Sequence, residues 1–268
     1  MIVNGKNTML KENNTISLHY KKLGSGPPLL ILHGLFGSLD NWQTVANSLV
    51  EYYTVYLIDL RNHGKSPHHP QMNYELMAED LIRFIQEHKL HTVNMIGHSM
   101  GGKVLMKLLT IGESLIHKAM VVDIGIKAYH GGHEEIFKAM FSLDLDHITK
   151  RSEAEAGLLP FIPEFGVRQF ILKNLDRKQD QKFEWKLNLH AIYKNYASIN
   201  ESLFPDHRIF TPVCFVLGSK SSYVSEEDCK EIKIYFPESE FVTVENAGHW
   251  IHADQPVKMV EVIKNFFN

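Results

Sequence analysis

The amino-acid sequence predicts an α/β protein in which helices cover both faces of a mostly parallel β-sheet. Short, continuously apolar runs recur along the 268 residues, as expected for strands that are buried on both faces. Segments with helical periodicity separate most of these runs, which is typical of parallel strands joined by crossover helices. One apolar run leads directly into Gly-x-Ser-x-Gly and then into a helical pattern, which indicates a sharp turn between a strand and a helix.

The predicted elements follow one another along the chain. The sequence begins as a β-hairpin with a turn over residues 12–15 and a second strand over 16–20. The later predicted strands cover residues 29–32, 54–58, 93–96, 119–122, 213–217 and 241–244. The predicted helices between and after them cover residues 42–50, 77–88, 103–110, 225–235 and 256–267. Ser225 with Asp228 three residues later is a capping-box pattern, which marks the start of the fourth of these helices.

The alternation of strands and helices stops between about residues 124 and 207. Val167, Phe170 and Ile171 recur there at helical spacing, and Phe183 and Trp185 alternate as in a short strand. We interpret residues 125–207 as an inserted, mainly helical lid, and residues 1–124 and 208–268 as the core. The order of the chain would place this lid over the carboxyl ends of the strands, where open α/β sheets bind ligands.

The composition argues against several classes of partner. The net charge is −3 and the isoelectric point is about 6.6, so nothing indicates binding to nucleic acid or to an anionic membrane. The sequence has no signal-peptide pattern and no run of about 18 apolar residues. The two cysteines, Cys214 and Cys229, are expected to be free thiols. We therefore expect a cytoplasmic protein whose partner is a small molecule.

The segment from Gly97 to Gly101 is the strongest functional motif. It follows the predicted strand 93–96 and precedes the predicted helix 103–110, which is the context of a nucleophile elbow. Glycines two residues on either side of Ser99 would relieve the steric crowding of such a turn. Ser99 would then lie at the N-terminus of a helix, where a developing negative charge is stabilised. Ser99 is the candidate nucleophile.

A serine hydroxyl needs an adjacent base, and in this arrangement the acid and then the histidine follow the serine along the chain. His249 lies in the loop after the last predicted strand and is the candidate base. His252 is the nearest competitor, but it is expected within or beside the start of the following helix.

The candidate acid is Asp123, which directly follows the predicted strand 119–122. The more frequent position for this acid follows the strand 213–217, but the sequence 218–224 contains no carboxylate. Glu226, Glu227 and Asp228 come later and are expected in the first turn of a helix, where they favour its dipole. Asp59 also ends a predicted strand, but it precedes Ser99 and so breaks the expected order.

An oxyanion hole requires two backbone N–H donors, one from the residue after the nucleophile and one from an earlier loop. These criteria indicate Met100 and, in the loop after strand 29–32, Leu35. Phe36 and Trp250 are candidate substrate contacts, and His33 is expected to have a structural role.

Residues 59–68 form a second dense motif, which invites comparison with phosphate loops and metal sites. The spacing Gly-x-x-x-x-Gly-Lys-Ser/Thr is absent, and the nearby histidines lack a recognised ligand spacing. We interpret the motif as a structural set of turns, and we expect no metal and no cofactor.

Together these motifs resemble the α/β-hydrolase superfamily, and within it the bacterial YbfF-type acyl esterases and their mitochondrial abhydrolase-domain relatives. The matching stretches are HGLFGSLDNW (33–42), DLRNHGKSPH (59–68), GHSMGGK (97–103), VVDI (121–124), SSYVSE (221–226) and AGHWIHA (247–253). The resemblance implies a triad of Ser99, Asp123 and His249, and hydrolysis of short acyl esters or acyl-CoA thioesters. The chain departs from these relatives at residues 124–127 and in the lid, so the resemblance does not imply a particular substrate.

The sequence thus predicts a cofactor-free serine hydrolase of small acyl esters or thioesters. Alternatives within the same fold are cleavage of a lactone or of a carbon–carbon bond, and a cofactor-free haloperoxidase. Haloalkane dehalogenases and epoxide hydrolases are disfavoured because they use an aspartate at the position of Ser99. A ligand-binding receptor that keeps the fold is the alternative outside enzymes.

Overall fold

A computed structural model describes residues 14–268 of the chain. The strands of its main sheet are β1 (Tyr20–Leu23), β2 (Pro28–Leu32), β3 (Thr54–Ile58), β4 (Val93–His98), β5 (Ile116–Val122), β8 (Val213–Gly218) and β9 (Glu240–Val244). Within the described residues this sheet has seven strands in the order β1-β3-β2-β4-β5-β8-β9. β1 runs antiparallel to β3 and every other neighbouring pair is parallel. The predicted fold class is therefore confirmed.

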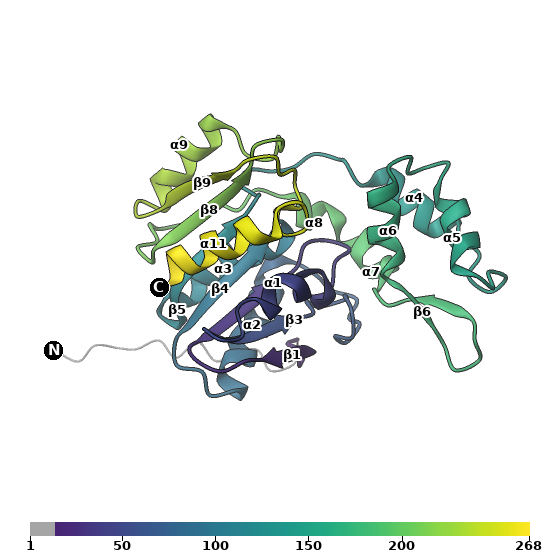
Figure 1. The fold of residues 1–268 in the computed structure, drawn as a ribbon, viewed down its shortest axis with the longest axis horizontal. Helices are drawn as coiled ribbons and strands as arrows, with labels where there is room; N and C mark the ends of the chain where they lie inside the picture. Colours follow the sequence, from purple (N-terminus) through teal and green to yellow (C-terminus); the bar gives the residue numbers. More distant parts are fainter. Residues whose placement is uncertain (1–13) are drawn as a thin grey trace.

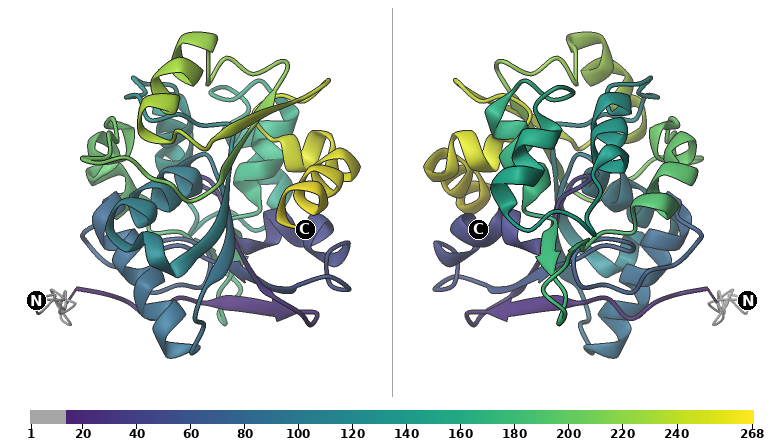
Figure 2. Two further views of the ribbon diagram at one scale, coloured as in Figure 1. Left: turned by 90° about the vertical axis from the view of Figure 1, so that its left-hand side faces the viewer. Right: turned by 90° about the vertical axis from the view of Figure 1, so that its right-hand side faces the viewer.

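Helices cover both faces of this sheet (Figure 2). They are η1 (Leu39–Trp42), α1 (Gln43–Asn47), α2 (Tyr74–Glu87), α3 (Met100–Gly112), η2 (Glu113–Leu115), α9 (Glu226–Tyr235), α10 (Ile251–Asp254) and α11 (Pro256–Phe267). Because successive strand side chains point to opposite faces, Leu30 and Leu32 of β2 belong to a core shared with α2, α3 and α9, whereas Leu29 and Ile31 belong to a second core shared with α1 and α11. The continuous apolar runs of the sequence thus supply two cores.

Most of the segment between β5 and β8 forms a group of elements set apart from the sheet, and its last helix, α8 (Tyr196–Asn200), lies between this group and the core (Figure 1). The segment also contains α4 (Glu134–Ser142), α5 (Arg151–Leu158), α6 (Phe165–Leu172) and α7 (Leu189–Lys194), with β6 (Leu175–Arg177) and β7 (Phe183–Trp185) as an antiparallel pair. We call residues 125–207 the inserted segment. Its function as a lid stays a prediction.

The predicted hairpin at the start of the chain is wrong in its second strand. Residues 15–19 form no strand, and β1 begins only at Tyr20. The Ile16 N–H donates to the Asp80 carboxylate at 2.8 Å and the His19 N–H donates to the Ser66 hydroxyl at 2.8 Å. Side chains therefore satisfy backbone groups that a strand ladder would have used. The predicted first strand of the hairpin lies outside the described residues.

Three predicted helices begin earlier than expected, and one of them is α3, which begins at Met100 and not at residue 103. The helix predicted over residues 42–50 begins as η1 at Leu39 and ends at Asn47. The helix predicted from Met77 begins at Tyr74, because the Asn73 side chain caps it by accepting the backbone N–H of residue 76 at 2.9 Å. The capping box predicted at the start of α9 is confirmed.

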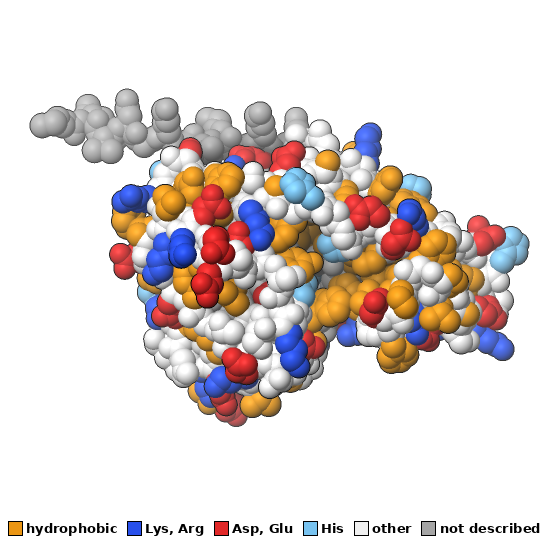
Figure 3. Space-filling model, turned by 90° about the horizontal axis from the view of Figure 1, so that it is seen from above, with side chains coloured by type: hydrophobic (Ala, Val, Ile, Leu, Met, Phe, Trp, Pro, Cys, Tyr) orange, Lys and Arg blue, Asp and Glu red, His pale blue; other side chains and the backbone are white. Residues whose placement is uncertain are grey.

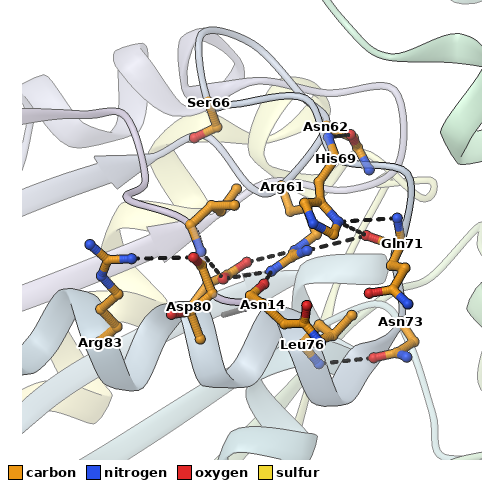
Figure 4. Close-up of polar contacts among 12 residues, drawn as sticks. Asn14, Arg61, Asn62, Ser66, His69, Gln71, Asn73, Leu76, Asp80 and Arg83 are labelled. Atoms are coloured by element: carbon orange, nitrogen blue, oxygen red, sulfur yellow. Dashed lines mark hydrogen bonds and ion pairs between the residues drawn. The ribbon is translucent and has the colours of Figure 1, made fainter. Parts of the chain in front are cut away.

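The motif at residues 59–68 is anchored by a buried ion pair (Figure 4). The Arg61 guanidinium donates to both carboxylate oxygens of Asp80 at 2.8 Å, and both side chains are almost fully buried. Arg61 also donates to the carbonyls of Asn14 and Gln71 at 2.6 and 3.2 Å. These contacts tie the loop after β3 to α2 and to the start of the described chain, which agrees with the structural interpretation of this motif. Within residues 14–268, no helix has both the length and the apolar character needed to cross a membrane.

Candidate active site

Ser99 occupies a strained turn between β4 and α3. Its φ of 51° and ψ of −118° are values that residues other than glycine rarely adopt. The Ser99 N–H donates to the Val122 carbonyl at 2.9 Å, and the Ser99 carbonyl accepts the N–H groups of Gly102 and Lys103 at 2.8 and 3.1 Å. The neighbouring strand and the first turn of α3 therefore hold the strained conformation in place.

This turn requires glycine at positions 97 and 101, because a side chain at either position would clash with a backbone carbonyl oxygen. A Cβ on Gly97 would lie 2.3 Å from the carbonyl oxygen of Gly101. A Cβ on Gly101 would lie 2.6 Å from the carbonyl oxygen of His33. The spacing of glycines in the sequence thus has the steric cause expected of a nucleophile elbow.

Asp123 lies directly after β5 and is only 1% exposed. Its carboxylate contacts the loops that follow β8 and β9. One carboxylate oxygen accepts the Gly218 N–H at 3.0 Å. The other accepts hydrogen bonds from His249 Nδ1 at 2.7 Å and from the Ser221 hydroxyl. The structure therefore brings together the predicted acid and the predicted base, which are far apart in the sequence.

The other carboxylates that were weighed as the acid have different contacts. Asp228 accepts the Ser225 N–H at 2.7 Å at the start of α9 and pairs with Lys127 Nζ at 2.6 Å. Asp59 accepts the backbone N–H of Leu39 at 2.8 Å, and burial raises the pKa of its carboxyl. Asp228 and Asp59 therefore stabilise elements around the site, and neither is the carboxylate bound to His249.

The imidazole of His249 is fixed in position by its neighbours. It stacks on the Tyr223 ring with the ring centres 3.7 Å apart and the planes 14° apart. His98 donates from Nε2 to the His249 carbonyl at 2.8 Å, which fixes the backbone. Since Nδ1 is bound to Asp123, Nε2 is the nitrogen left to act as a base. His252, the competitor, is instead stacked face to face on Trp42 with ring centres 4.4 Å apart.

The loop after β2 runs directly beside the candidate nucleophile. A Cβ on Gly34 would lie 3.2 Å from the Cβ of Ser99. Within residues 14–268, neither the Leu35 N–H nor the Met100 N–H has a hydrogen-bond partner. Phe36 is held at a φ of 58°, and its carbonyl accepts a hydrogen bond from Asn174 of the inserted segment at 2.7 Å. The inserted segment thus contacts the loop that carries the candidate oxyanion donor.

Ser99 and His249 line the same cavity, of about 220 Å³, between the core and the inserted segment. Its walls include Phe36 and Trp250, the two predicted substrate contacts, together with Phe170 from α6. The rings of Phe170 and Trp250 lie 5.5 Å apart across this wall. Figure 3 shows the hollow from above, with hydrophobic side chains on both sides. The cavity suits an uncharged, apolar group.

Several other histidines near the cavity are held neutral by burial. Burial lowers the pKa of His33 and His133 to about 4 and that of His252 to about 3, and it lowers the pKa of His98 well below its usual value. His33 donates from Nδ1 to the Gly34 carbonyl at 2.8 Å and accepts the Leu60 N–H at Nε2 at 3.0 Å. This neutral form has the structural role expected for His33.

No three His, Cys, Asp or Glu side chains within the described residues are grouped so that they could hold a metal ion. The arrangement offers instead a strained serine, a histidine bound to a carboxylate, and two free backbone N–H groups. Such a set can carry out acyl transfer through a covalent intermediate.

Sequence reasoning did not identify three residues of the site. Ser221 donates to Asp123, Tyr223 stacks on His249, and Asn174 holds the Phe36 carbonyl. Ser221 and Tyr223 lie in the loop after β8, the position of the more frequent acid. At this position the chain has a hydroxyl that donates to Asp123 and not a carboxylate. A serine in the loop after β8 is therefore the sequence signal for this contact.

Comparisons with known proteins show that the chain belongs to the α/β-hydrolase family. Residues 27–146 match the model of the alpha/beta hydrolase fold family. The chain is 35% identical to Esterase YbfF of Escherichia coli, over 90% of this chain and 93% of that protein. It is 37% identical to the sn-1-specific diacylglycerol lipase of Danio rerio, over 91% of this chain and 79% of that protein.

Solved structures agree with the sequence comparisons. The structure of a marine microorganism esterase superposes with a TM-score of 0.93 at 41% identity, covering 94% of this chain and all of that one. The resemblance to YbfF-type esterases and abhydrolase-domain proteins is therefore confirmed.

Proposed function

This chain belongs to the α/β-hydrolase family, and from that premise we propose that it is a serine hydrolase of small acyl esters or acyl thioesters. The observation that carries the proposal is the hydrogen bond of 2.7 Å between Asp123 and His249, beside a strained Ser99 that lines the same cavity as His249. The names of the relatives support ester hydrolysis, since they include an esterase and a lipase.

The proposed reaction has two stages. His249 Nε2 takes the proton of the Ser99 hydroxyl while the oxygen attacks the carbonyl carbon, and the same histidine then gives this proton to the departing alcohol or thiol. This stage leaves an acyl group on Ser99. In the second stage His249 takes a proton from water, the hydroxide attacks the acyl carbon, and the proton returns to Ser99 as the acid leaves.

Asp123 and the backbone donors assist this reaction. The Asp123 carboxylate keeps the proton of His249 on Nδ1 and stabilises the imidazolium that forms. The Leu35 and Met100 N–H groups would donate to the oxyanion of each tetrahedral intermediate. Loss of one such donor typically lowers kcat by ~10²–10³.

The proposal is tested by the rates at which the protein hydrolyses p-nitrophenyl acetate, butyrate and octanoate. We expect turnover by the wild type, and a loss of at least ~10³-fold in Ser99→Ala, because the nucleophile is removed. Ser48→Ala is the matched control, since Ser48 is an exposed serine at the end of α1 and does not line the cavity. Equal rates in the wild type and Ser99→Ala would overturn the proposal.

A ligand receptor of the same fold is separated by labelling with a fluorophosphonate. Stoichiometric labelling of Ser99 together with fast ester turnover supports the enzyme. Saturable ligand binding with almost no turnover would instead support the receptor. Within the enzyme class, turnover of lactones or of carbon–carbon bonds in preference to esters would replace the proposed substrate class.

A further inference from the structure

A second cavity, of about 330 Å³, also opens onto Ser99. It lies on the side of Met100, the proposed oxyanion donor, and His249 does not line it. Its walls differ from those of the first cavity, because they include two lysines, Lys103 and Lys127, together with Tyr129. The candidate nucleophile therefore lies between an apolar cavity and a cationic one.

Lys103 is a buried cation in the wall of the second cavity. Its side chain is on α3, one helical turn after Ser99, and is 1% exposed. Its Nζ donates to the carbonyls of Lys127 and Glu201 at 2.8 and 2.5 Å, and lies 5.0 Å from the centre of the Tyr129 ring. Two of its three N–H groups are thereby used.

No carboxylate within residues 14–268 forms an ion pair with Lys103. Burial lowers the pKa of its ammonium to about 8. A buried charge normally has an opposite charge beside it, because desolvation is costly. Lys103 instead has two carbonyls, the rings of Tyr74 and Tyr129, and the charge of Glu201 beyond ion-pair distance, which only partly offsets the effect of burial. An anionic ligand group would supply a closer opposite charge.

Lys127 adds a second, weaker positive group to the same cavity. It is 35% exposed and pairs with Asp228 at 2.6 Å, so much of its charge is already balanced. Lys103 is therefore the main candidate for binding an anion.

The position of His249 assigns the two cavities to the two parts of a substrate. The departing alcohol or thiol must lie near His249 in order to receive its proton, and only the first cavity is lined by His249. The acyl chain then extends in another direction from the carbonyl carbon, past Met100 and toward Lys103.

We infer that the second cavity binds acyl groups that end in a carboxylate, with Lys103 as the residue that selects them. The inference rests on the proposed function, since it names the substrate class of the same site. The acyl group is transferred to Ser99 and then to water, so the products are a dicarboxylic acid and a neutral alcohol or thiol. The terminal carboxylate binds Lys103 throughout and takes no part in the bond changes.

The test compares two esters that differ only in charge, ethyl hydrogen glutarate and its neutral amide, ethyl glutaramate. We expect the wild type to hydrolyse the anionic ester with the higher kcat/KM. In Lys103→Met the ratio of the two kcat/KM values should fall by roughly 10- to 100-fold, the contribution typical of a hydrogen bond to a charged group. Lys127→Met should lower the ratio by a smaller factor.

Lys107→Met is the matched control, because Lys107 is on the same helix and pairs with Glu75 outside the cavity. It should leave the ratio unchanged. An equal loss for both esters in Lys103→Met would overturn the inference, because it would show that Lys103 only holds the carbonyls of Lys127 and Glu201.

The wild-type comparison needs no variant, so the inference remains testable if Lys103→Met does not fold. A wild-type preference for ethyl glutaramate would overturn the inference and leave the serine hydrolase intact. If the wild type hydrolysed neither of these two esters and none of the p-nitrophenyl esters, the result would instead count against the proposed function itself.

Discussion

Replacing Asp123 with asparagine tests how the carboxylate controls His249. One carboxylate oxygen accepts the Gly218 N–H, and the other accepts His249 Nδ1 and the Ser221 hydroxyl. Asparagine has one oxygen. If that oxygen faces Gly218, the amide NH₂ faces His249 and only an unprotonated Nδ1 can accept from it. The imidazole proton then lies on Nε2, which can no longer take the proton of Ser99.

The opposite orientation of the amide is disfavoured. It would place the NH₂ group against the Gly218 N–H, and a buried donor without an acceptor costs about 1–3 kcal/mol. We therefore expect the inactive tautomer of His249 to dominate. The expected loss in kcat is ~10⁴-fold, or about 5.4 kcal/mol at 1.36 kcal/mol per factor of ten.

The assay is the steady-state hydrolysis of p-nitrophenyl butyrate by Asp123→Asn, with Asp228→Asn as the matched control. Asp228 follows β8 in sequence but caps α9 and pairs with Lys127, so its loss should leave kcat within about threefold of the wild type. A kcat within tenfold of the wild type in Asp123→Asn would refute this reasoning, as would a larger loss in Asp228→Asn.

Further predictions concern stability and the coupling of the inserted segment to the site. Burial lowers the pKa of His33 and His133 to about 4 and that of His252 to about 3, whereas in the unfolded chain these histidines titrate near 6.5. The unfolded chain therefore binds more protons between these values, and each such histidine should lower the free energy of unfolding by up to about 1.4 kcal/mol per pH unit as the pH falls below 6.5. Urea unfolding at pH 7.5 and 5.5 measures this effect, and equal free energies at the two values would contradict it. Asp80→Asn should destabilise the protein by roughly 3–5 kcal/mol, because it leaves the buried Arg61 without its counter-charge; an unchanged urea midpoint would show that the pair is dispensable. Asn174→Ala should lower kcat by about tenfold and change KM less, because it releases the strained Phe36 carbonyl beside the proposed oxyanion donor; a change confined to KM would assign Asn174 to substrate binding instead.

The sheet was predictable because its strands are buried on both faces, which requires continuous apolar runs. The errors lie at the ends of elements, where side chains replace backbone partners. Ile16 binds Asp80 and His19 binds Ser66, so an expected strand is absent. These partners are 64 and 47 residues away, and no local pattern indicates them.

The candidate triad was predictable in position because chain order and strand ends restrict where each member can lie. Ser99, Asp123 and the loop that carries His249 each follow a parallel strand, so they reach the same edge of the sheet. Their supporting contacts were not predictable. The bond between Asn174 and Phe36 joins residues 138 apart and depends on how the inserted segment packs on the core.

The burial of Lys103 in the wall of the second cavity was also not predictable from the sequence. Lys103 follows the Gly-x-Ser-x-Gly motif in the sequence, where a lysine in a helix would ordinarily be a surface residue. In the structure it is buried, and its Nζ donates to carbonyls near both ends of the inserted segment, at Lys127 and Glu201.

The most direct test of the central claim is the identity of the residue that carries the acyl group during turnover. Samples quenched with acid within milliseconds of mixing with p-nitrophenyl butyrate can be digested and mapped by mass spectrometry. We expect a butyryl group on the peptide that contains Ser99, and neither this adduct nor turnover in Ser99→Ala. A butyryl group on any other residue, or undiminished turnover in Ser99→Ala, would contradict the central claim.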